Sequence, residues 1–164
     1  MSAEPRVQPA LRRMRIDDID AVMRIEREAY AYPWTARIFE DCIRVGYDCR
    51  VLEVDGRQVG HCVLTLAAGE AHLLNLTVDP RWQSNGLGRF MVQRLFEYVC
   101  SQPVEALFLE VRPSNVAAVH LYLSEGFEHI GTRPRYYPLP SGREDAWVLS
   151  RRCMAAAGAD HSGL

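Results

Sequence analysis

The stretch QSNGLG, residues 83–88, places two glycines two positions apart between an apolar run and a helical pattern. The run before it is HLLNLTVDP, residues 72–80, and from its last residues onward Leu87, Met91, Leu95 and Val99 recur at helical spacing. A helix that starts after such a loop offers unpaired backbone N–H groups and a partial positive charge, which suit an anion such as a pyrophosphate. The glycines either permit a tight turn or let a ligand approach the backbone. The stretch alone leaves both explanations open.

Two common nucleotide-binding motifs do not fit this stretch. A dinucleotide fold needs a third small residue, but the window from Gly86 reads GLGRFM and has Met91 at that position. A P-loop needs a lysine, and all 19 basic residues of this chain are arginines. The lack of lysine also excludes a lysine nucleophile or Schiff base.

The composition predicts one globular domain without a strong electrostatic partner. The chain has 164 residues, of which 48% are hydrophobic and 24% charged, and its net charge is −2. This charge favours neither nucleic acid nor an anionic membrane as a partner. The N-terminus has no apolar signal core, and no run approaches the roughly 20 apolar residues of a membrane span. We therefore expect a cytoplasmic protein that contacts neither nucleic acid nor membrane directly.

The cysteines predict reduced thiols. Their number is odd and no two of them form a CxxC pair, which is typical of core-filling cysteines in a reducing compartment. They are Cys42, Cys49, Cys62, Cys100 and Cys153.

The order of periodic segments predicts an α/β domain on a mixed sheet of about seven strands flanked by about four helices. Asp17 and Thr35 are the expected caps of the first two helices, and Asp55-Gly56 is the expected turn of a hairpin. The expected strands are 11–15, 49–54, 58–66, 71–78, 106–111, 127–132 and 146–149, and the expected helices are 17–30, 35–45, one that begins after residue 88, and 115–125. An aromatic loop, residues 133–145, separates the last two strands. The domain is expected to span residues 11–152, with flexible termini at 1–10 and 153–164.

A second group of polar residues follows the strand 106–111. Asn115 and Tyr122 are seven positions apart, so they lie on one face of a helix, and Glu110 ends the preceding strand. Together these three side chains could surround one thioester. Taken singly, Glu110 is equally explained as an ion-paired strand end and Tyr122 as a core aromatic.

The spacing Gln83-x-x-Gly86-x-Gly88, after a strand ending Val78-Asp79-Pro80, resembles the acetyl-CoA motif of the GNAT superfamily of N-acetyltransferases. The element order resembles that fold as well. The resemblance implies acetyl-CoA as co-substrate, no metal, Glu110 as base and Tyr122 as acid. It also implies a splayed strand whose backbone pairs with the pantetheine arm, a loop that holds the pyrophosphate, and Asn115 as a further cofactor contact. The implied pantetheine residues are Leu76, Thr77 and Val78, and the implied loop residues are Ser84, Asn85, Gly86, Leu87, Gly88 and Arg89.

Within the superfamily, the chain is most similar to the bacterial ribosomal-protein-alanine N-acetyltransferases of the RimI type. The similar stretches are Tyr32-Pro33-Trp34-Thr35, Leu74-Asn75-Leu76, LEVRPSN at 109–115, Tyr136-Tyr137-Pro138 and GREDA at 142–146. This resemblance implies a monomer that acetylates the N-terminal alanine of small-subunit ribosomal protein eighteen by direct attack. Two alternatives remain open at this stage. One is acetylation of another protein N-terminus, a lysine or a small amine, and the other is a non-catalytic acetyl-CoA-binding regulator.

Two further features bear on substrate binding. Ser84 and Asn85 stand where many relatives have Arg or Gln, which predicts weaker binding of coenzyme A. Acidic residues in the first two helices either form charged outer faces, which is the simpler interpretation, or favour a basic substrate tail. They are Glu26, Glu28, Glu40 and Asp41.

Overall fold

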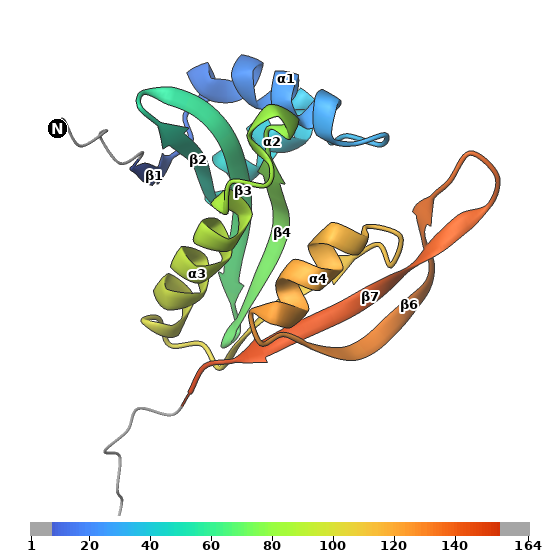
Figure 1. The fold of residues 1–164 in the computed structure, drawn as a ribbon. Helices are drawn as coiled ribbons and strands as arrows, with labels where there is room; N and C mark the ends of the chain where they lie inside the picture. The colour runs from blue at the N-terminus through green and yellow to red at the C-terminus, as the bar shows by residue number, and fades with distance from the viewer. Residues whose placement is uncertain (1–7, 155–164) are drawn as a thin grey trace, which may run out of the picture.

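The computed structural model describes residues 8–154, which form a seven-stranded mixed sheet with two helices on each side of it (Figure 1). The strand order is β1-β2-β3-β4-β5-β7-β6. Every neighbouring pair is antiparallel except β4 and β5, which are parallel. The strands are β1 (Pro9–Arg13), β2 (Asp48–Val54), β3 (Arg57–Ala67), β4 (Glu70–Val78), β5 (Ala106–Val111), β6 (Glu128–Pro138) and β7 (Arg143–Arg152). The helices are α1 (Ile19–Ala29), α2 (Ala36–Arg44), α3 (Leu87–Cys100) and α4 (Val116–Ser124), with short 3₁₀ turns at Ile16–Asp18 and Pro80–Trp82. The predicted mixed sheet and its four helices are confirmed.

Two apolar clusters, one on each face of the sheet, hold the helices in place. Alternation along β2 shows the division, because Val51 packs toward α1 and α2 whereas Leu52 packs toward α3. Phe39 is buried in the first cluster, and Met91 and Leu95 are buried in the second. Full burial of side chains of this size contributes about 1.5–3 kcal/mol each to folding.

The sheet opens between β4 and β5. These strands pair only from Glu70 with Ala106 to Leu73 with Leu109, and β4 then continues to Val78 bonded to β3 alone. Figure 1 shows β4 and β7 diverging, with α4 lying in the opening. The predicted splay of this strand is confirmed.

The predicted turn at Asp55-Gly56 and the predicted cap at Thr35 are confirmed, whereas the predicted cap at Asp17 is wrong. Asp55 and Gly56 have φ of 51° and 76°, the left-handed geometry of a two-residue hairpin turn. The side chain of Thr35 accepts a hydrogen bond from the Ile38 N–H, and that of Asn115 accepts one from the Ala118 N–H, so both cap their helices. Asp17 is not a cap, because it lies inside the 3₁₀ turn that precedes α1.

The prediction of an aromatic loop over 133–145 was wrong. Most of it is strand, since β6 extends to Pro138 and β7 begins at Arg143. The register shifts between Arg133 and Tyr137, and Arg135 has a φ of 52°. This irregularity interrupts the two-residue alternation by which a strand is recognised in a sequence. The outcome is a long hairpin that projects from the domain (Figure 1).

The prediction that all cysteines are reduced was also wrong, because Cys100 and Cys153 form a disulfide. Antiparallel pairing of β7 with β5 returns the chain to the end of α3, and the Cys153 N–H donates to the Glu105 carbonyl. A contact between residues 53 positions apart has no local sequence signal. Cys153 is therefore tied to the domain, and β1 begins at Pro9, inside the arm predicted to be flexible. The rest of that prediction concerns residues 1–7 and 155–164, which lie outside the described range.

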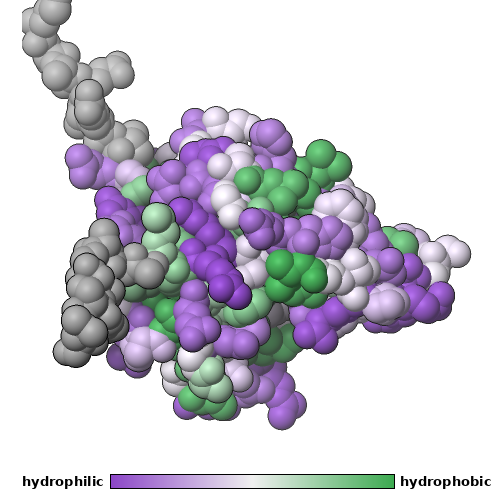
Figure 2. All heavy atoms as spheres, turned by 90° about the horizontal axis from the view of Figure 1, so that it is seen from below, coloured by the Kyte–Doolittle hydropathy of each residue, from purple (hydrophilic) through white to green (hydrophobic). Residues whose placement is uncertain are grey.

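The described part of the chain contains no helix that is both long enough and apolar enough to cross a membrane. Figure 2, which views the molecule from below, shows a mostly hydrophilic face with separate hydrophobic patches.

Candidate active site

The loop after β4 and the start of α3 form one wall of a hollow, here called the loop cleft. Gly86 is the N-cap of α3, and no side chain caps this helix end. The first N–H groups of α3 therefore have no intrahelical acceptor, and the helix dipole adds positive charge there. The loop cleft is lined by Ala29, Tyr30, Leu76, Thr77, Val78, Gln83, Ser84, Gly86, Leu87, Gly88, Arg89, Asn115, Ala117, Ala118 and Leu121.

The two glycines of QSNGLG have different local roles. Gly86 has a φ of 75°, which favours glycine at this turn, and a side-chain atom there would meet open space. A Cβ on Gly88 would lie 3.2 Å from the Leu121 side chain, so this glycine lets α3 approach α4 closely. Both residues also line the loop cleft, so turn, packing and access for a ligand coincide at this junction.

The remaining loop side chains mostly stabilise the protein itself. Asn85 donates to the carbonyl oxygens of Trp82 and Gln83, and its side chain does not line the cleft. Arg89 pairs with Glu125 at the end of α4, so its charge is shared with that carboxylate. An anion in the loop cleft would therefore contact backbone N–H groups more than side chains.

The splayed end of β4 forms the opposite wall. Leu76, Thr77 and Val78 line the loop cleft, and among the described residues no strand pairs with them on their β5 side. The Leu76 carbonyl accepts a hydrogen bond of 2.8 Å from the Tyr30 hydroxyl, and the Val78 carbonyl accepts one of 3.3 Å from the Gln83 amide. The sequence predicts Tyr30 only as a helix end and as part of a peptide-groove wall, so its contact with this strand was not foreseen.

A second hollow, here called the aromatic cleft, continues from the first. Both hollows are lined by Tyr30, Leu76, Asn115 and Ala118, so they meet at these residues. The aromatic cleft contains Glu110, Asn115 and Tyr122 together, as the sequence predicts. Its other lining residues are Glu26, Tyr32, Trp34, Leu73, Leu74, Asn75, Leu109, Val111, Arg112 and Tyr137.

Glu110, which lines this cleft, has a charged partner. Its Oε1 atom lies 2.6 Å from the Arg133 Nε atom of β6, and the glutamate side chain is 26% exposed. A hydrogen bond to Glu110 raises the pKa of the Tyr136 hydroxyl above its ordinary value. Glu110 is thus a solvent-accessible carboxylate held by the β6–β7 hairpin.

Tyr122 projects from α4 with its ring in the core. Its side chain is buried, and its ring packs edge-on against Phe127 at a centroid distance of 5.6 Å. Burial raises the pKa of the Tyr122 hydroxyl above its ordinary value, because the ionised form is poorly solvated there. The hydroxyl is therefore protonated at neutral pH, and Tyr122 is one of the residues that line the aromatic cleft.

Glu26 does not lie on an outer helix face, contrary to the simpler expectation. It is 1% exposed, because it lies one helical turn after the buried Val22. Its carboxylate accepts hydrogen bonds from the Trp34 N–H at 3.1 Å and the Thr77 hydroxyl at 3.2 Å, and it contacts His61 Nε2 at 2.8 Å. The helical phase of the apolar residues could have revealed this position. Glu28 and Asp41 are exposed and Glu40 is half-buried, as outer-face residues should be.

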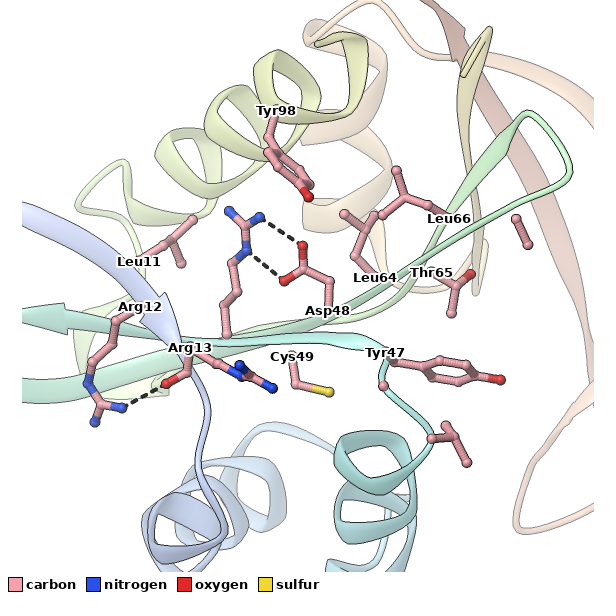
Figure 3. Close-up of a pocket in the computed structure, with 14 residues that line it drawn as sticks. Leu11, Arg12, Arg13, Tyr47, Asp48, Cys49, Leu64, Thr65, Leu66 and Tyr98 are labelled. Atoms are coloured by element: carbon pink, nitrogen blue, oxygen red, sulfur yellow. Dashed lines mark hydrogen bonds and ion pairs between the residues drawn. The ribbon is translucent and has the colours of Figure 1, made fainter. Parts of the chain in front are cut away.

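A third hollow lies beside the ends of β2 and β3 and contains none of the predicted site residues (Figure 3). Arg50 binds both carboxylate oxygens of Asp48 at 2.8 Å, and its guanidinium lies 4.3 Å from the centre of the Tyr98 ring. The Arg50 and Asp48 charges at its centre are thus already paired with each other. Across residues 8–154, no group of three or more His, Cys, Asp or Glu side chains is placed to hold a metal ion.

Comparison with known proteins agrees with this geometry. Residues 19–127 match the model of the Acetyltransferase (GNAT) family. The chain is 37% identical over 133 residues to the ribosomal protein bS18-alanine N-acetyltransferase of Escherichia coli K12, and the alignment covers 81% of this chain and 90% of that protein. The protein of the same description from Haemophilus ducreyi is 32% identical over 135 residues, with 81% and 92% coverage. The chain therefore belongs to the GNAT family of acetyltransferases, whose acyl donor is acetyl-CoA.

Solved structures support the same assignment. The crystal structure of the ribosomal-protein-S18-alanine N-acetyltransferase from Escherichia coli superimposes with a TM-score of 0.84 at 34% identity, covering 92% of this chain and 98% of that one. The structure of Ard1 from Thermoplasma volcanium gives a TM-score of 0.80 at 26% identity, covering 90% and 99%. The predicted GNAT fold is confirmed.

Proposed function

We propose that this protein transfers the acetyl group of acetyl-CoA to the α-amino group of the N-terminal alanine of ribosomal protein bS18. One observation carries the proposal. The loop cleft opens directly into the aromatic cleft, where Glu110 and Tyr122 lie together, in a chain 37% identical to an enzyme of that description. A donor and an acceptor entering from the two ends would meet where the hollows join.

The loop cleft fits the donor. Its uncapped helix start would hold the pyrophosphate of acetyl-CoA, and the open side of β4 would hold the pantetheine arm. The thioester would then lie near Asn115 and Ala118, which belong to both hollows. Holding amine and thioester in line in this way removes much of the entropic part of the barrier.

The aromatic cleft supplies an acid and a base. The amine nitrogen attacks the thioester carbonyl carbon, the carbon–sulfur bond breaks, and the departing thiolate needs a proton. Glu110 takes the proton of the attacking amine, and Tyr122 gives one to the thiolate. General acid–base assistance of this kind is typically worth about 10²–10⁴-fold. An α-ammonium group, with a pKa near 8, needs less help at neutral pH than a lysine side chain near 10.4.

The test is direct acetylation of a peptide. Purified protein is incubated with acetyl-CoA and a hexapeptide beginning Ala-Arg-Tyr, the start that the resemblance implies, beside an N-terminally blocked lysine peptide. Mass spectrometry is expected to find acetyl on the free alanine alone. Acetylation of the blocked lysine peptide only would contradict the proposal. No product on either peptide, although acetyl-CoA binds, would favour a small amine or a regulatory role instead.

A further inference from the structure

Arg112 joins several walls of the aromatic cleft. Its guanidinium carbon lies 5.3 Å from the ring centre of Tyr32, between α1 and α2, and 4.4 Å from that of Tyr137 on β6. Its Nη1 atom donates to the Pro138 carbonyl at 2.9 Å and lies 3.4 Å from Glu144 Oε1. A guanidinium fixed between two aromatic rings loses little further freedom when it binds a ligand.

Most of the hydrogen-bonding capacity of Arg112 is unused. Both of these contacts involve Nη1, and Nε and Nη2 have no hydrogen-bond partner within residues 8–154. The side chain lines the aromatic cleft and is 23% exposed. Glu144, its acidic neighbour, is also occupied, since it accepts from the Ser114 N–H and hydroxyl at 2.9 and 2.8 Å. The aromatic cleft is therefore lined by a guanidinium that is held in place and has unused N–H donors.

The distance between Glu110 and Arg112 determines which atom of a bound acceptor the Arg112 N–H groups can reach. Glu110 lies in β5 and Arg112 directly follows this strand, and both line the aromatic cleft. In an extended chain, Cα atoms two positions apart are separated by about 6.5–7 Å. In a polypeptide, the carbonyl oxygen of the first residue lies about 3 Å from the α-nitrogen. An acceptor whose amine is at Glu110 would bring this oxygen toward the Arg112 side chain. A lysine side chain or a simple amine has no carbonyl at that distance.

We propose that Arg112 binds the first peptide carbonyl of the acceptor and thereby selects polypeptide α-amines over other amines. The inference rests on the proposed function, and it adds a recognition residue to the acid and base. A hydrogen bond from a charged donor to this carbonyl is expected to raise kcat/KM by about tenfold or more.

The test compares two acceptors in two enzymes. One acceptor is the alanine hexapeptide, and the other has an (E)-alkene in place of its first peptide bond, which removes that carbonyl and keeps the chain geometry. The wild-type protein is expected to prefer the natural peptide by about tenfold or more in kcat/KM. In Arg112→Met the preference is expected to fall toward one, because the alkene peptide has no carbonyl contact to lose.

Controls separate recognition from folding. Arg37→Met makes the same substitution on α2, at a side chain that is 89% exposed, and should leave the preference unchanged. Thermal unfolding and the KM for acetyl-CoA report whether Arg112→Met keeps the fold and the donor site. If that variant fails to fold, Arg112→Lys, which keeps the charge and the stem, should show a smaller loss of the same preference.

Three results would overturn the inference. The first is a wild-type protein that does not prefer the natural peptide. The second is an equal loss for both peptides in Arg112→Met, which would show that Arg112 only holds the walls together. The third is an undiminished preference in the folded variant. Failure of the wild-type protein to acetylate either peptide would instead refute the proposed function, and the inference with it.

Discussion

Glu110, the base that we propose, is paired with a cation in the structure. Arg133 neutralises its charge in the structure described here, and the Tyr136 hydroxyl is held beside it. An arriving amine therefore has to reach a carboxylate that the β6–β7 hairpin already contacts. In the proposed mechanism, the position of the β6–β7 hairpin therefore affects whether the Glu110 carboxylate is available to the amine. Substitutions at Glu110 and Tyr122 are the sharpest tests at the scale of single residues.

Glu110→Gln and Tyr122→Phe should each lower kcat by about 10²–10⁴-fold, because each removes one proton-transfer group with little change in shape. Both variants should bind acetyl-CoA as the wild-type protein does, measured by calorimetry. Tyr98→Phe is the matched control, since Tyr98 lies in the hollow of Figure 3 and outside both clefts. A kcat within tenfold of wild type in either site variant would remove that residue from the mechanism.

The residues foreseen from the sequence are those whose role depends on local spacing. Asn115 and Tyr122 share a face because they are two helical turns apart, and Gly86 has the positive φ that a loop glycine suggests. The contacts of Glu26 and Arg112 were not foreseen, because they are made with segments distant in the sequence. The Glu26 network joins α1 to β3 and β4, and Arg112 joins β5 to both aromatic walls.

The splay of β4 from β5 is the feature of secondary structure on which the proposed acetyl-CoA site depends. Gly60 on β3 lies opposite Val78 at the free end of β4, and a Cβ added there would be 2.6 Å from the Thr77 carbonyl oxygen. A backbone atom at that distance cannot move aside without moving the strand. Glycine at this position therefore sets the path of the wall that faces the loop cleft.

Gly60→Ala should lower the free energy of unfolding by about 1–3 kcal/mol and raise the KM for acetyl-CoA. Gly131→Ala is the control, because its added Cβ would meet only Val148 at 4.0 Å and its φ is not positive. Urea unfolding and steady-state kinetics measure both effects. Equal stability and equal KM in the two variants would show that β4 tolerates displacement.

At the level of elements, strands with clean alternation and helices with a cap were predicted within a few residues. The β6–β7 hairpin was not, because its register shift near Arg135 destroys the alternation. That hairpin carries Arg133 and Tyr137 to the aromatic cleft. The aromatic cleft was therefore harder to predict from the sequence than the loop cleft.

At the scale of the whole molecule, the Cys100–Cys153 disulfide links the end of β7 to the end of α3. A crosslink between residues 53 positions apart restricts the unfolded chain and adds up to about 4 kcal/mol to stability. Cys153→Ser should lower the urea midpoint, and a reducing agent should lower it in the wild-type protein by the same amount. An unchanged midpoint in reducing buffer would show that the disulfide adds nothing to stability.

A buried tyrosine hydroxyl and a buried cysteine thiol make the stability of the folded state decrease at high pH. Burial raises the pKa of Tyr30 from 10.0 to about 12, and that of Cys62 from 9.0 to about 12. The folded state then keeps protons that the unfolded chain releases, so stability is complete below the unfolded pKa values and is lost as pH rises through the folded ones. Because the chain has no lysine, no lysine titrates in this range.

The free energy of unfolding should therefore fall from pH 9 to pH 11, with Tyr30 accounting for about 1.4 kcal/mol of the fall. Tyr30→Phe should show a correspondingly shallower decline in urea titrations at each pH. Parallel curves for the two proteins would contradict the assignment to Tyr30.

The proposed function depends most on the identity of the acetyl acceptor. A reaction with intact ribosomal protein bS18 that has a free N-terminal alanine tests this identity directly. The protein and acetyl-CoA are mixed with bS18, and peptide mapping by mass spectrometry locates any acetyl group. We expect one acetyl group on the α-nitrogen of the alanine, and none when Glu110→Gln replaces the wild-type protein. Acetyl groups on lysine side chains, or an unmodified bS18 beside an enzyme that binds acetyl-CoA, would contradict it.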